Sequence, residues 1–479
     1  MTAEELFNNV LSKAKVFGLT AKNDGRTIID PKGNSIIRNN LLPMSFSDGS
    51  AFFSFLSSDE ETAGPYSDFS FVVFPDDKDN VTACVVSLGV GSSGFKNDYL
   101  LASLPGTRRL FLKLNHYSNT FFKTSFDDIE STSLDLLKKV RADYPNLKTV
   151  IESYKTVLPA SIILDFTDDK YDNCFETIYT WLATYAKMRA WGTAAQRKEI
   201  EKQLNKIPTP ILPDEVGDVK HLLDTRKYVV LQGAPGTGKT YTALEIAKQY
   251  KKSFFEQFHA ETNYSDFVYG LEPNIDESDS SVHFKSKKGI LYKAIEYAKK
   301  HSEDEVLLII DEINRANLSN VLGPVFYLFE YQSGDRKVNI KIGDMELDKL
   351  PEKLHVIATM NTADRSLAVV DFALRRRFAW YTLRPHEVKT PSDKIFMKDI
   401  YNSIANIFFE FATDEELNLQ PGQSYFIVNK SNKDTETKER LIYELMPLIK
   451  EYLAEGYLLK AKDSFCDLFL EKTGLLMYE

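Results

Sequence analysis

A glycine-rich segment in the middle of the chain has the residues needed to bind a triphosphate. Residues 233–240 read GAPGTGKT and match the pattern G-x-x-x-x-G-K-[ST], after a strand-like run at Tyr228–Leu231 and before a helical segment. In such a turn, backbone N–H groups face the phosphates and the helix N-terminus favours their negative charge. Lys239 is expected to neutralise the β- and γ-phosphates, and Thr240 to bind Mg²⁺ through its hydroxyl. The residues predicted to contact the nucleotide are Gly233, Pro235, Gly236, Thr237, Gly238, Lys239 and Thr240.

Polar residues follow two further apolar runs. Val306–Ile310 is continued by Asp311 and Glu312, and Leu354–Met360 is continued by Asn361. Ligands bind at the carboxyl ends of strands in open parallel sheets, so these side chains are expected near the glycine-rich segment. Asp311 is predicted to be the Mg²⁺ partner, Glu312 to polarise the attacking water, and Asn361 to hold that water or the γ-phosphate. Adjacent acids after a strand are also common as plain turn residues, and the upstream glycine-rich segment favours the catalytic interpretation.

Three consecutive arginines, Arg375–Arg377, lie just beyond these motifs. The order of phosphate loop, acidic strand, polar-ended strand and helices resembles an AAA+ ATPase core rather than a small GTPase. In such cores the nucleotide lies between neighbouring subunits of a ring, so an arginine supplied by a neighbour completes the site. These arginines are the candidates, and the alternative is a solvated basic face.

The hydrophobic pattern predicts the sheet that must position these residues. From Lys227 onward, apolar runs alternate with helical segments, which indicates an α/β fold with a parallel sheet covered by helices. After Arg384, amphipathic helices dominate. We therefore expect an α/β nucleotide-binding subdomain at residues 213–385 and a helical lid subdomain at residues 386–479.

The upstream part has a different pattern. Strand-like runs such as FSFVVF at Phe69–Phe74 lie between segments of helical period, which predicts an α+β domain at residues 1–165. Residues 166–212 are expected to form a helical linker that ends in a proline-rich stretch. A glycine-rich run at Gly89–Gly94 matches G-x-G-x-x-G, but without a long following helix or a suitably spaced acid, a tight loop is the better interpretation.

Composition excludes several classes of protein. The 479 residues carry 59 Lys+Arg and 69 Asp+Glu, a formal net charge of -10, with 43% hydrophobic residues, which argues for several packed domains and against wholesale coating of nucleic acid. No stretch approaches the roughly 18 consecutive apolar residues of a membrane span, and the N-terminus has no signal-peptide run. A cytoplasmic protein without a membrane association is expected.

Two longer stretches carry a resemblance to a known family. The runs IIDEINRANLSNVLGPVFYLFE (Ile309–Glu330) and MNTADRSLAVVDFALRRRF (Met360–Phe378) closely resemble the McrB family, the AAA+ GTPase subunit of modification-dependent restriction systems. FHAETNYSDFVYGLEPN (Phe258–Asn274), GQSYF (Gly422–Phe426) and YELMPLIKEYL (Tyr443–Leu453) match as well, so the resemblance covers nearly all of residues 227–460. The Met-Asn-x-x-Asp-Arg element is the most specific part of it.

The resemblance implies a function and a set of partners. It implies a homo-hexameric ring that binds Mg²⁺ and hydrolyses GTP, with ATP as the alternative, and that acts in anti-phage defence with a McrC-type endonuclease subunit. The chain would not itself be a nuclease, and residues 1–165 would select the DNA, for example by 5-methylcytosine. By the same resemblance, the residues with roles in hydrolysis are Glu312, Asn361 as the sensor-like position, Asp364 and Arg365 of the signature, and Arg376 and Arg377 toward a neighbour's nucleotide.

Other readings of the chain stay open at this point. A MoxR-like AAA+ ATPase that remodels protein clients would share the same core, and the N-terminal domain could instead be an effector or oligomerisation module. A reader that flips bases out of DNA would need a pocket with aromatic surfaces, yet most of the many Phe and Tyr residues at strand spacing are expected in the core. Arg108, Arg109, Lys113 and His116 form a compact basic group that could contact phosphate.

Overall fold

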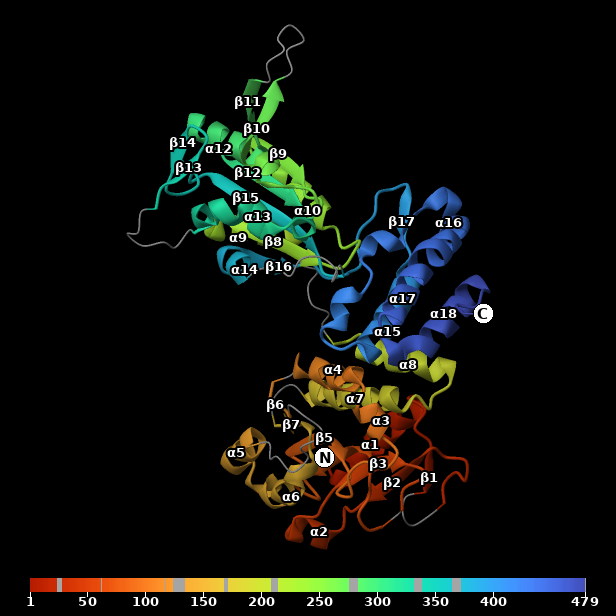
Figure 1. Cartoon of the computed structure of the whole chain (residues 1–479). Helices are drawn as coiled ribbons and strands as arrows, with labels where there is room; N and C mark the ends of the chain where they lie inside the picture. Colours follow the sequence, from red (N-terminus) through yellow and green to blue (C-terminus); the bar gives the residue numbers. More distant parts are fainter. Residues whose placement is uncertain are drawn as a thin grey trace. The chain divides into compact units, whose positions relative to one another are not determined.

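The chain forms two compact units, Met1–Pro210 and Ile211–Glu479 (Figure 1). The structure is a computed structural model that describes residues 1–23, 28–61, 63–116, 118–123, 134–167, 171–207, 214–274, 283–330, 338–363 and 372–478. Asp364 and Arg365, which the resemblance assigns to the family signature, lie outside the described residues. Within the described residues, no helix is both long enough and apolar enough to cross a membrane.

The first unit is built on a seven-stranded sheet with the order β1-β2-β3-β4-β5-β7-β6. β1 and β2 pair in parallel and all other neighbours are antiparallel. Every residue of β4 and of β5 is buried, which is expected of strands covered on both faces. The bounds are β1 Ala21–Asn23, β2 Ser35–Asn39, β3 Phe53–Ser57, β4 Phe69–Pro75, β5 Ala83–Val90, β6 Thr120–Phe122 and β7 Ala160–Asp165.

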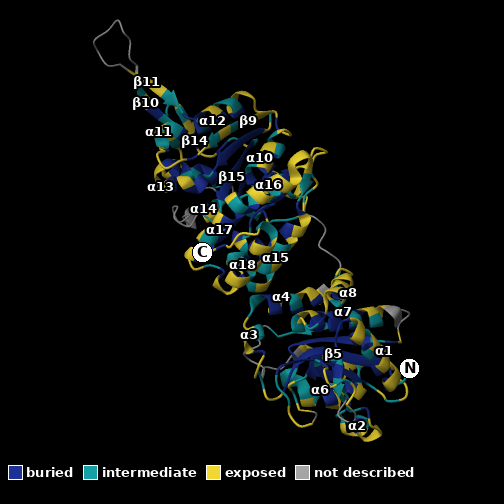
Figure 2. Cartoon of the chain, turned by 90° about the vertical axis from the view of Figure 1, so that its right-hand side faces the viewer, coloured by how far each residue is buried: buried dark blue, intermediate teal, exposed yellow. Residues whose placement is uncertain are grey.

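Helices cover both faces of this sheet. Because side chains alternate along a strand, Phe71 and Val73 of β4 join one core with α1 (Ala3–Val16) and α7 (Tyr171–Arg189). Val72 and Phe74 join the other core, with α5 (Leu134–Asp143) and α6 (Lys148–Tyr154). Figure 2 shows β5 buried between these layers. The structure thus contains the predicted α+β domain, but as a three-layer arrangement.

The segment expected to be a linker belongs to the first unit instead. α7 and α8 (Ala194–Leu204) fall within Met1–Pro210, and α7 supplies core residues at helical spacing: Ile178, Trp181, Leu182 and Tyr185, all fully buried. This spacing places their side chains along one stripe of the helix, which covers the sheet. The sequence pattern did not indicate that this helix belongs to the first unit. A helix with one apolar stripe has the same pattern whether it connects two domains or packs within one of them.

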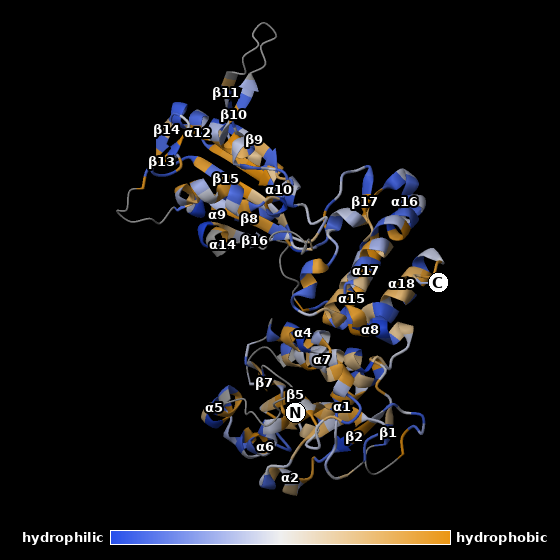
Figure 3. Ribbon diagram, in the orientation of Figure 1, coloured by the Kyte–Doolittle hydropathy of each residue, from blue (hydrophilic) through white to orange (hydrophobic). Residues whose placement is uncertain are grey.

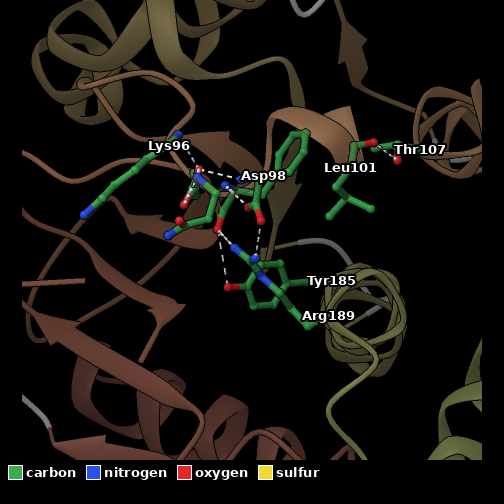
Figure 4. Close-up of polar contacts among 9 residues, drawn as sticks. Lys96, Asp98, Leu101, Thr107, Tyr185 and Arg189 are labelled. Atoms are coloured by element: carbon green, nitrogen blue, oxygen red, sulfur yellow. Dashed lines mark hydrogen bonds and ion pairs between the residues drawn. The ribbon is translucent and has the colours of Figure 1, made fainter. Parts of the chain in front are cut away.

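A buried ion pair fastens α7 to the rest of the first unit (Figure 4). Arg189 Nη1 lies 2.8 Å from Asp98 Oδ1, and the two side chains are only 6% and 9% exposed. Arg189 also donates to the backbone carbonyl of Phe69 in β4. Breaking a buried pair of this kind leaves an uncompensated charge and costs about 3–5 kcal/mol. The end of α7 is therefore anchored by charge as well as by packing.

The second unit contains the predicted parallel sheet, with the order β16-β8-β15-β12-β9. All four strand pairs are parallel, and Figure 3 shows hydrophobic residues concentrated in the strands. One face packs against α9 and α10, and the other against α12 and α13. The bounds are β8 Tyr228–Gly233, β9 Lys252–Gln257, β12 Val306–Asp311, β15 Leu354–Asn361, β16 Ala379–Thr382, α9 Glu215–Arg226, α10 Lys239–Ala247, α12 Ile290–Lys300 and α13 Leu318–Leu322. The α/β prediction is confirmed.

A helical subdomain with its own core completes the second unit. Its helices are α15 (Lys398–Phe411), α16 (Lys433–Arg440), α17 (Met446–Ala454) and α18 (Lys462–Thr473), and its core includes Ile404, Phe408, Leu445, Ile449 and Phe465. Two three-residue strands that the sequence pattern did not predict, β17 (Lys394–Phe396) and β18 (Ile427–Asn429), pair within it. Strands this short carry no detectable period. Two hairpins in the α/β part were also not predicted: β10 (Tyr269–Asn274) with β11 (His283–Lys288), and β13 (Ile340–Ile342) with β14 (Met345–Leu347).

Candidate nucleotide-binding site

The glycine-rich segment forms a turn between β8 and α10. Gly236 and Gly238 have φ angles of +78° and +88°, a region that residues with side chains rarely adopt. Lys239 begins α10, is 8% exposed, and its ammonium donates to the backbone carbonyls of Gly233 and Ala234, both at 2.9 Å. The ammonium is thus held within the turn, at the end of the helix where a phosphate would bind.

A buried carboxylate lies beside the first turn of α10. Asp311 ends β12, is 7% exposed, and its Oδ1 accepts hydrogen bonds from Thr240 Oγ1 at 2.8 Å and from Thr359 Oγ1 at 2.6 Å. Hard oxygen donors from a hydroxyl and a carboxylate suit Mg²⁺, which takes only one or two protein ligands beside phosphate and water. The donor set therefore fits the predicted ion, with Thr240 and Asp311 as the residues that would hold it.

Glu312 follows with an unusual backbone conformation. Its φ and ψ are 54° and 48°, in the left-handed region, and its N–H donates to Thr359 Oγ1 at 3.0 Å. A non-glycine residue held in this region costs of order 1–3 kcal/mol and persists where the surrounding structure enforces it. Among the described residues, Glu312 Oε2 is buried without a hydrogen bond, with Arg315 Nε 3.5 Å away. The carboxylate can therefore accept a hydrogen bond from a water.

Asn361 ends the strand that lies between the other two. β15 pairs with β8 and with β12, and its register places Asn361 opposite Gly233 of the phosphate-binding turn. The next N–H, that of Thr362, donates to the Gly233 carbonyl at 3.1 Å. The Asn361 side-chain oxygen accepts from Ala363 N at 3.2 Å, so its amide group is oriented by its own loop. The topology brings the predicted sensor-like residue to the edge of the sheet that carries Asp311.

The arginines at the end of α14 (Phe372–Arg377) differ from one another. Arg376 is exposed, whereas Arg377 forms an ion pair with Glu330 and lies 5.5 Å from the ring centre of Phe326. Arg375 is exposed and lies 5.1 Å from the ring centre of Trp380. Of the two arginines predicted to reach a neighbour's nucleotide, Arg376 is exposed, whereas Arg377 already has a carboxylate partner.

Four residues at the site were not among the predicted ones. Thr359 bonds both Asp311 and the Glu312 backbone, and its sequence signal is a hydroxyl near the end of an otherwise apolar strand. Gly422, Gln423 and Ser424, from the helical subdomain, bond the phosphate-binding turn. The sequence contains no local signal for such a contact, because the two segments lie almost 190 residues apart.

Comparison with known proteins agrees with this geometry. A family model of the AAA domain (dynein-related subfamily) matches residues 228–378. The chain is 34% identical over 257 residues to the EcoKMcrB subunit of a type IV methyl-directed restriction enzyme of Escherichia coli (strain K12), which covers 48% of this chain and 54% of that protein. It is 27% identical over 206 residues to the YdiS component of the type II restriction enzyme BsuMI of Bacillus subtilis (strain 168), covering 34% of this chain and 59% of that protein.

The chain thus spans a little over half the length of these curated relatives. Among solved structures, a putative ATPase from Cytophaga hutchinsonii is 19% identical and covers 54% of this chain and 79% of that chain, with a TM-score of 0.26. The fold assignment rests on the family model and the strand order rather than on that likeness. The relatives do not favour the MoxR-like alternative. Residues 228–378 match the AAA domain family (dynein-related subfamily), and over about half its length the chain is homologous to the McrB restriction subunit.

Proposed function

We propose that this chain is the nucleotide-hydrolysing subunit of a McrBC-type restriction complex. GTP is the proposed substrate, with ATP as the alternative, and the proposed partners are further copies of the chain in a hexameric ring, DNA and a McrC-type endonuclease. The observation that carries the proposal is the hydrogen bond between Thr240 and Asp311, which joins the phosphate-binding turn to the acidic strand at the edge of a parallel sheet. The relationship to two restriction-enzyme components supports the biological setting.

Each residue of the site then has a role in hydrolysis. The Lys239 ammonium and the N–H groups of the turn bind the β- and γ-phosphates. Mg²⁺, when bound by Thr240 and Asp311, neutralises charge on the phosphate oxygens. Glu312 accepts a hydrogen bond from the attacking water and orients it, and the Asn361 amide donates to that water or to the γ-phosphate. Arg376 of a neighbouring subunit stabilises the charge that develops in the transition state.

The choice of GTP rests on the family relationship. The chain has no Asn-Lys-x-Asp motif, the element by which small GTPases recognise guanine, so no residue of the sequence selects the base by itself. Phosphate release from GTP and from ATP by the purified chain, with the Lys239→Ala variant as control, tests the activity. Hydrolysis by the parental chain that is abolished in Lys239→Ala is expected, and preference for ATP would move the proposal toward the remodelling ATPase.

A cavity in the first unit supports the proposed recognition of modified DNA. It has a volume of about 260 Å³, and beside aliphatic and small residues its lining includes four aromatic side chains and one arginine: Phe52, Tyr66, Phe74, Tyr154 and Arg38. The Arg38 guanidinium lies 5.0 Å from the Tyr66 ring centre. Burial raises the pKa of Tyr66 to about 12, so its hydroxyl stays protonated, and it lies 3.1 Å from Ser70 Oγ. Aromatic faces and hydrogen-bonding groups are what a flipped base requires.

DNA binding by the full chain tests this part of the proposal. Duplexes with unmodified cytosine, 5-methylcytosine or 5-hydroxymethylcytosine are compared at one stated salt concentration, because phosphate attraction otherwise masks selectivity. Tyr154→Ala is expected to remove selectivity for a modified duplex, whereas Tyr99→Ala, at an exposed position outside the cavity, is expected to retain it. Equal binding to all duplexes by the parental chain would contradict a modification reader.

A further inference from the structure

The helical subdomain contacts the phosphate-binding turn through residues 422–424, Gly-Gln-Ser, which we name the lid turn. Gly422 N donates to the Pro235 carbonyl at 2.9 Å, and Ser424 N donates to the Gly236 carbonyl at 3.0 Å. Gln423 Nε2 donates to the Thr237 carbonyl at 2.7 Å. Three successive carbonyls of the phosphate-binding turn are thus bonded to three successive residues of the lid turn.

The approach of the two backbones is too close for a side chain. A Cβ atom on Gly422 would lie 2.1 Å from the Gly236 carbonyl carbon and 2.2 Å from Thr237 N. A Cβ atom on Gly236 would in turn lie 2.4 Å from Ser424 Oγ. Real Cβ atoms essentially never lie within 3.0 Å of another heavy atom, and the atoms that obstruct a Cβ on Gly422 belong to the backbone, so the contact requires glycine at position 422. The lid turn and the phosphate-binding turn are therefore in close contact through their backbones.

Gln423 is buried there without its full set of hydrogen bonds. It is 8% exposed, its donor group is used on Thr237, and its Oε1 is buried without a hydrogen bond among the described residues. A buried acceptor without a partner destabilises a fold, so an apolar side chain of the same length would serve packing better. Packing stability therefore does not explain a glutamine at this position.

The residues that follow the lid turn pack in the core of the helical subdomain. The lid turn continues into Phe426, which is 1% exposed within that core and whose carbonyl accepts from Met397 N at 2.8 Å, one residue before α15. Two hydrogen bonds, from Met397 N to the Phe426 carbonyl and from Gln423 Nε2 to the Thr237 carbonyl, together with the chain between residues 423 and 426, therefore link the start of α15 to the phosphate-binding turn.

We infer that Gln423 is a positioning residue for the nucleotide: its carboxamide holds the Thr237 carbonyl and keeps the phosphate-binding turn in the shape that receives the triphosphate. The inference rests on the proposed nucleotide hydrolysis and adds a residue from outside the α/β subdomain to it. Because the turn binds the phosphates in the ground state and the transition state alike, loss of the bond weakens binding more than it slows turnover at saturation.

Binding of a fluorescent GTP analogue and of its ATP counterpart to the full chain tests the inference, together with steady-state hydrolysis. Gln423→Met keeps the length of the side chain and removes the donor. It is expected to raise the dissociation constant and KM by about 5- to 10-fold, the loss of one buried hydrogen bond, with kcat changed by less than about twofold. The melting temperature without nucleotide is expected to stay at the parental value.

Two further variants separate positioning from folding. Gln203→Met removes an equally buried glutamine in the first unit, 3% exposed and bonded to Glu176, and is expected to leave nucleotide binding unchanged. Gly422→Ala forces the two turns apart and is expected to weaken binding by at least about 10-fold, beyond the loss of one hydrogen bond. If Gln423→Met lowers the melting temperature, the affinity of Gly422→Ala for the nucleotide analogue decides whether the lid turn positions the phosphate-binding turn.

The outcomes of these experiments test the role of the lid turn separately from the proposed nucleotide hydrolysis. Parental affinity in both Gln423→Met and Gly422→Ala, beside loss of binding in Lys239→Ala, would overturn the role of the lid turn and leave the proposed hydrolase intact. Absence of nucleotide binding by the parental chain would overturn both. Weakened binding in the two lid-turn variants alone, with parental affinity in Gln203→Met, is the result that the inference requires.

Discussion

Thr240 and Asp311 lie 71 positions apart in the chain, yet the threonine hydroxyl donates to the aspartate Oδ1 at 2.8 Å. The bond exists because β8 and β12 are parallel strands on either side of β15, so that both motifs emerge at the same edge of the sheet. Thr359, on the intervening strand, donates to the same oxygen at 2.6 Å. Two hydroxyls thus orient the carboxylate.

This relationship predicts the behaviour of Thr240→Val. The substitution keeps the shape of the side chain and removes the Mg²⁺ ligand, so hydrolysis is expected to fall by at least about 100-fold, with a higher requirement for Mg²⁺. Phosphate release measured over a range of Mg²⁺ concentrations checks this. The control is Thr242→Val, at a buried threonine of the same helix, which is expected to hydrolyse at close to the parental rate. Equal Mg²⁺ dependence in the two variants would contradict the assignment.

The two candidate arginines are expected to respond differently. Arg376→Ala is expected to lower hydrolysis by at least about 100-fold, because it removes the arginine proposed to stabilise the transition state at a neighbour's nucleotide. The melting temperature is expected to stay unchanged, because the side chain is exposed. Arg377→Ala removes the ion pair with Glu330 and is expected to lower the melting temperature by a few degrees.

Mixed assemblies test whether Arg376 acts on a neighbour. Arg376→Ala subunits keep Glu312, and Glu312→Gln subunits keep the arginine, so a ring containing both has some complete sites. Hydrolysis by the mixture above the sum of the separate variants is expected. If no such recovery occurs, Arg376 does not act across a subunit boundary.

The extent of the first unit predicts which fragments of the chain fold by themselves. Residues 1–210 include α7, whose Trp181 and Tyr185 are fully buried against the sheet, whereas residues 1–165 lack it. Loss of that core face removes more than the 5–15 kcal/mol by which domains are ordinarily stable. Fragment 1–210 is therefore expected to unfold cooperatively on heating, as followed by near-ultraviolet circular dichroism, and fragment 1–165 to lack a folded signal. A cooperative transition in the shorter fragment would contradict the placement of α7.

A buried histidine makes stability depend on pH. His355 of β15 is 7% exposed, and its Nδ1 lies 2.6 Å from the Tyr250 hydroxyl. Burial, assisted by the Lys220 ammonium, lowers the His355 pKa below its ordinary value of 6.5, although Glu305 and Asp224 act in the opposite direction. Below pH 6.5 the unfolded chain then binds more protons than the folded one, so stability falls as the pH falls toward the folded pKa.

The His355→Asn variant checks this sign. It removes the titrating group, so its free energy of unfolding is expected to fall less than that of the parental chain between pH 7.5 and pH 5.5. The difference between the two slopes is expected to be at most about 1.4 kcal/mol per pH unit. Thermal unfolding of both proteins across this range is the measurement. The same pH dependence in the two chains would show that His355 is not the responsible group.

The sequence predicted the parts of the site that are local. The glycine-rich turn has its own flanking strand and helix, and Asp311, Glu312 and Asn361 each end an apolar run, so period and position alone placed them at one edge of the sheet. The parallel direction of the strands, though not their order in the sheet, followed from their alternation with helices. Neither inference depended on knowing how distant segments pack.

What the sequence did not predict depends on tertiary contacts. Gln423 belongs to the helical subdomain, and only folding brings its amide to the Thr237 carbonyl. The pairing of Arg377 with Glu330 likewise joins two separate elements and was not visible in a run of three arginines. The helices at residues 171–204 were expected to connect two domains, because their apolar stripe does not reveal which surface it covers.

The most direct test of the proposed function is a comparison of binding and turnover in Glu312→Gln. The amide keeps the size of the side chain and cannot take up a proton, so the variant is expected to bind the GTP analogue with parental affinity and to hydrolyse GTP at least about 100-fold more slowly. Glu303→Gln, at an exposed position away from the site, is the matched control. Hydrolysis by Glu312→Gln at the parental rate would contradict the account of this site as a hydrolase in which Glu312 orients the attacking water.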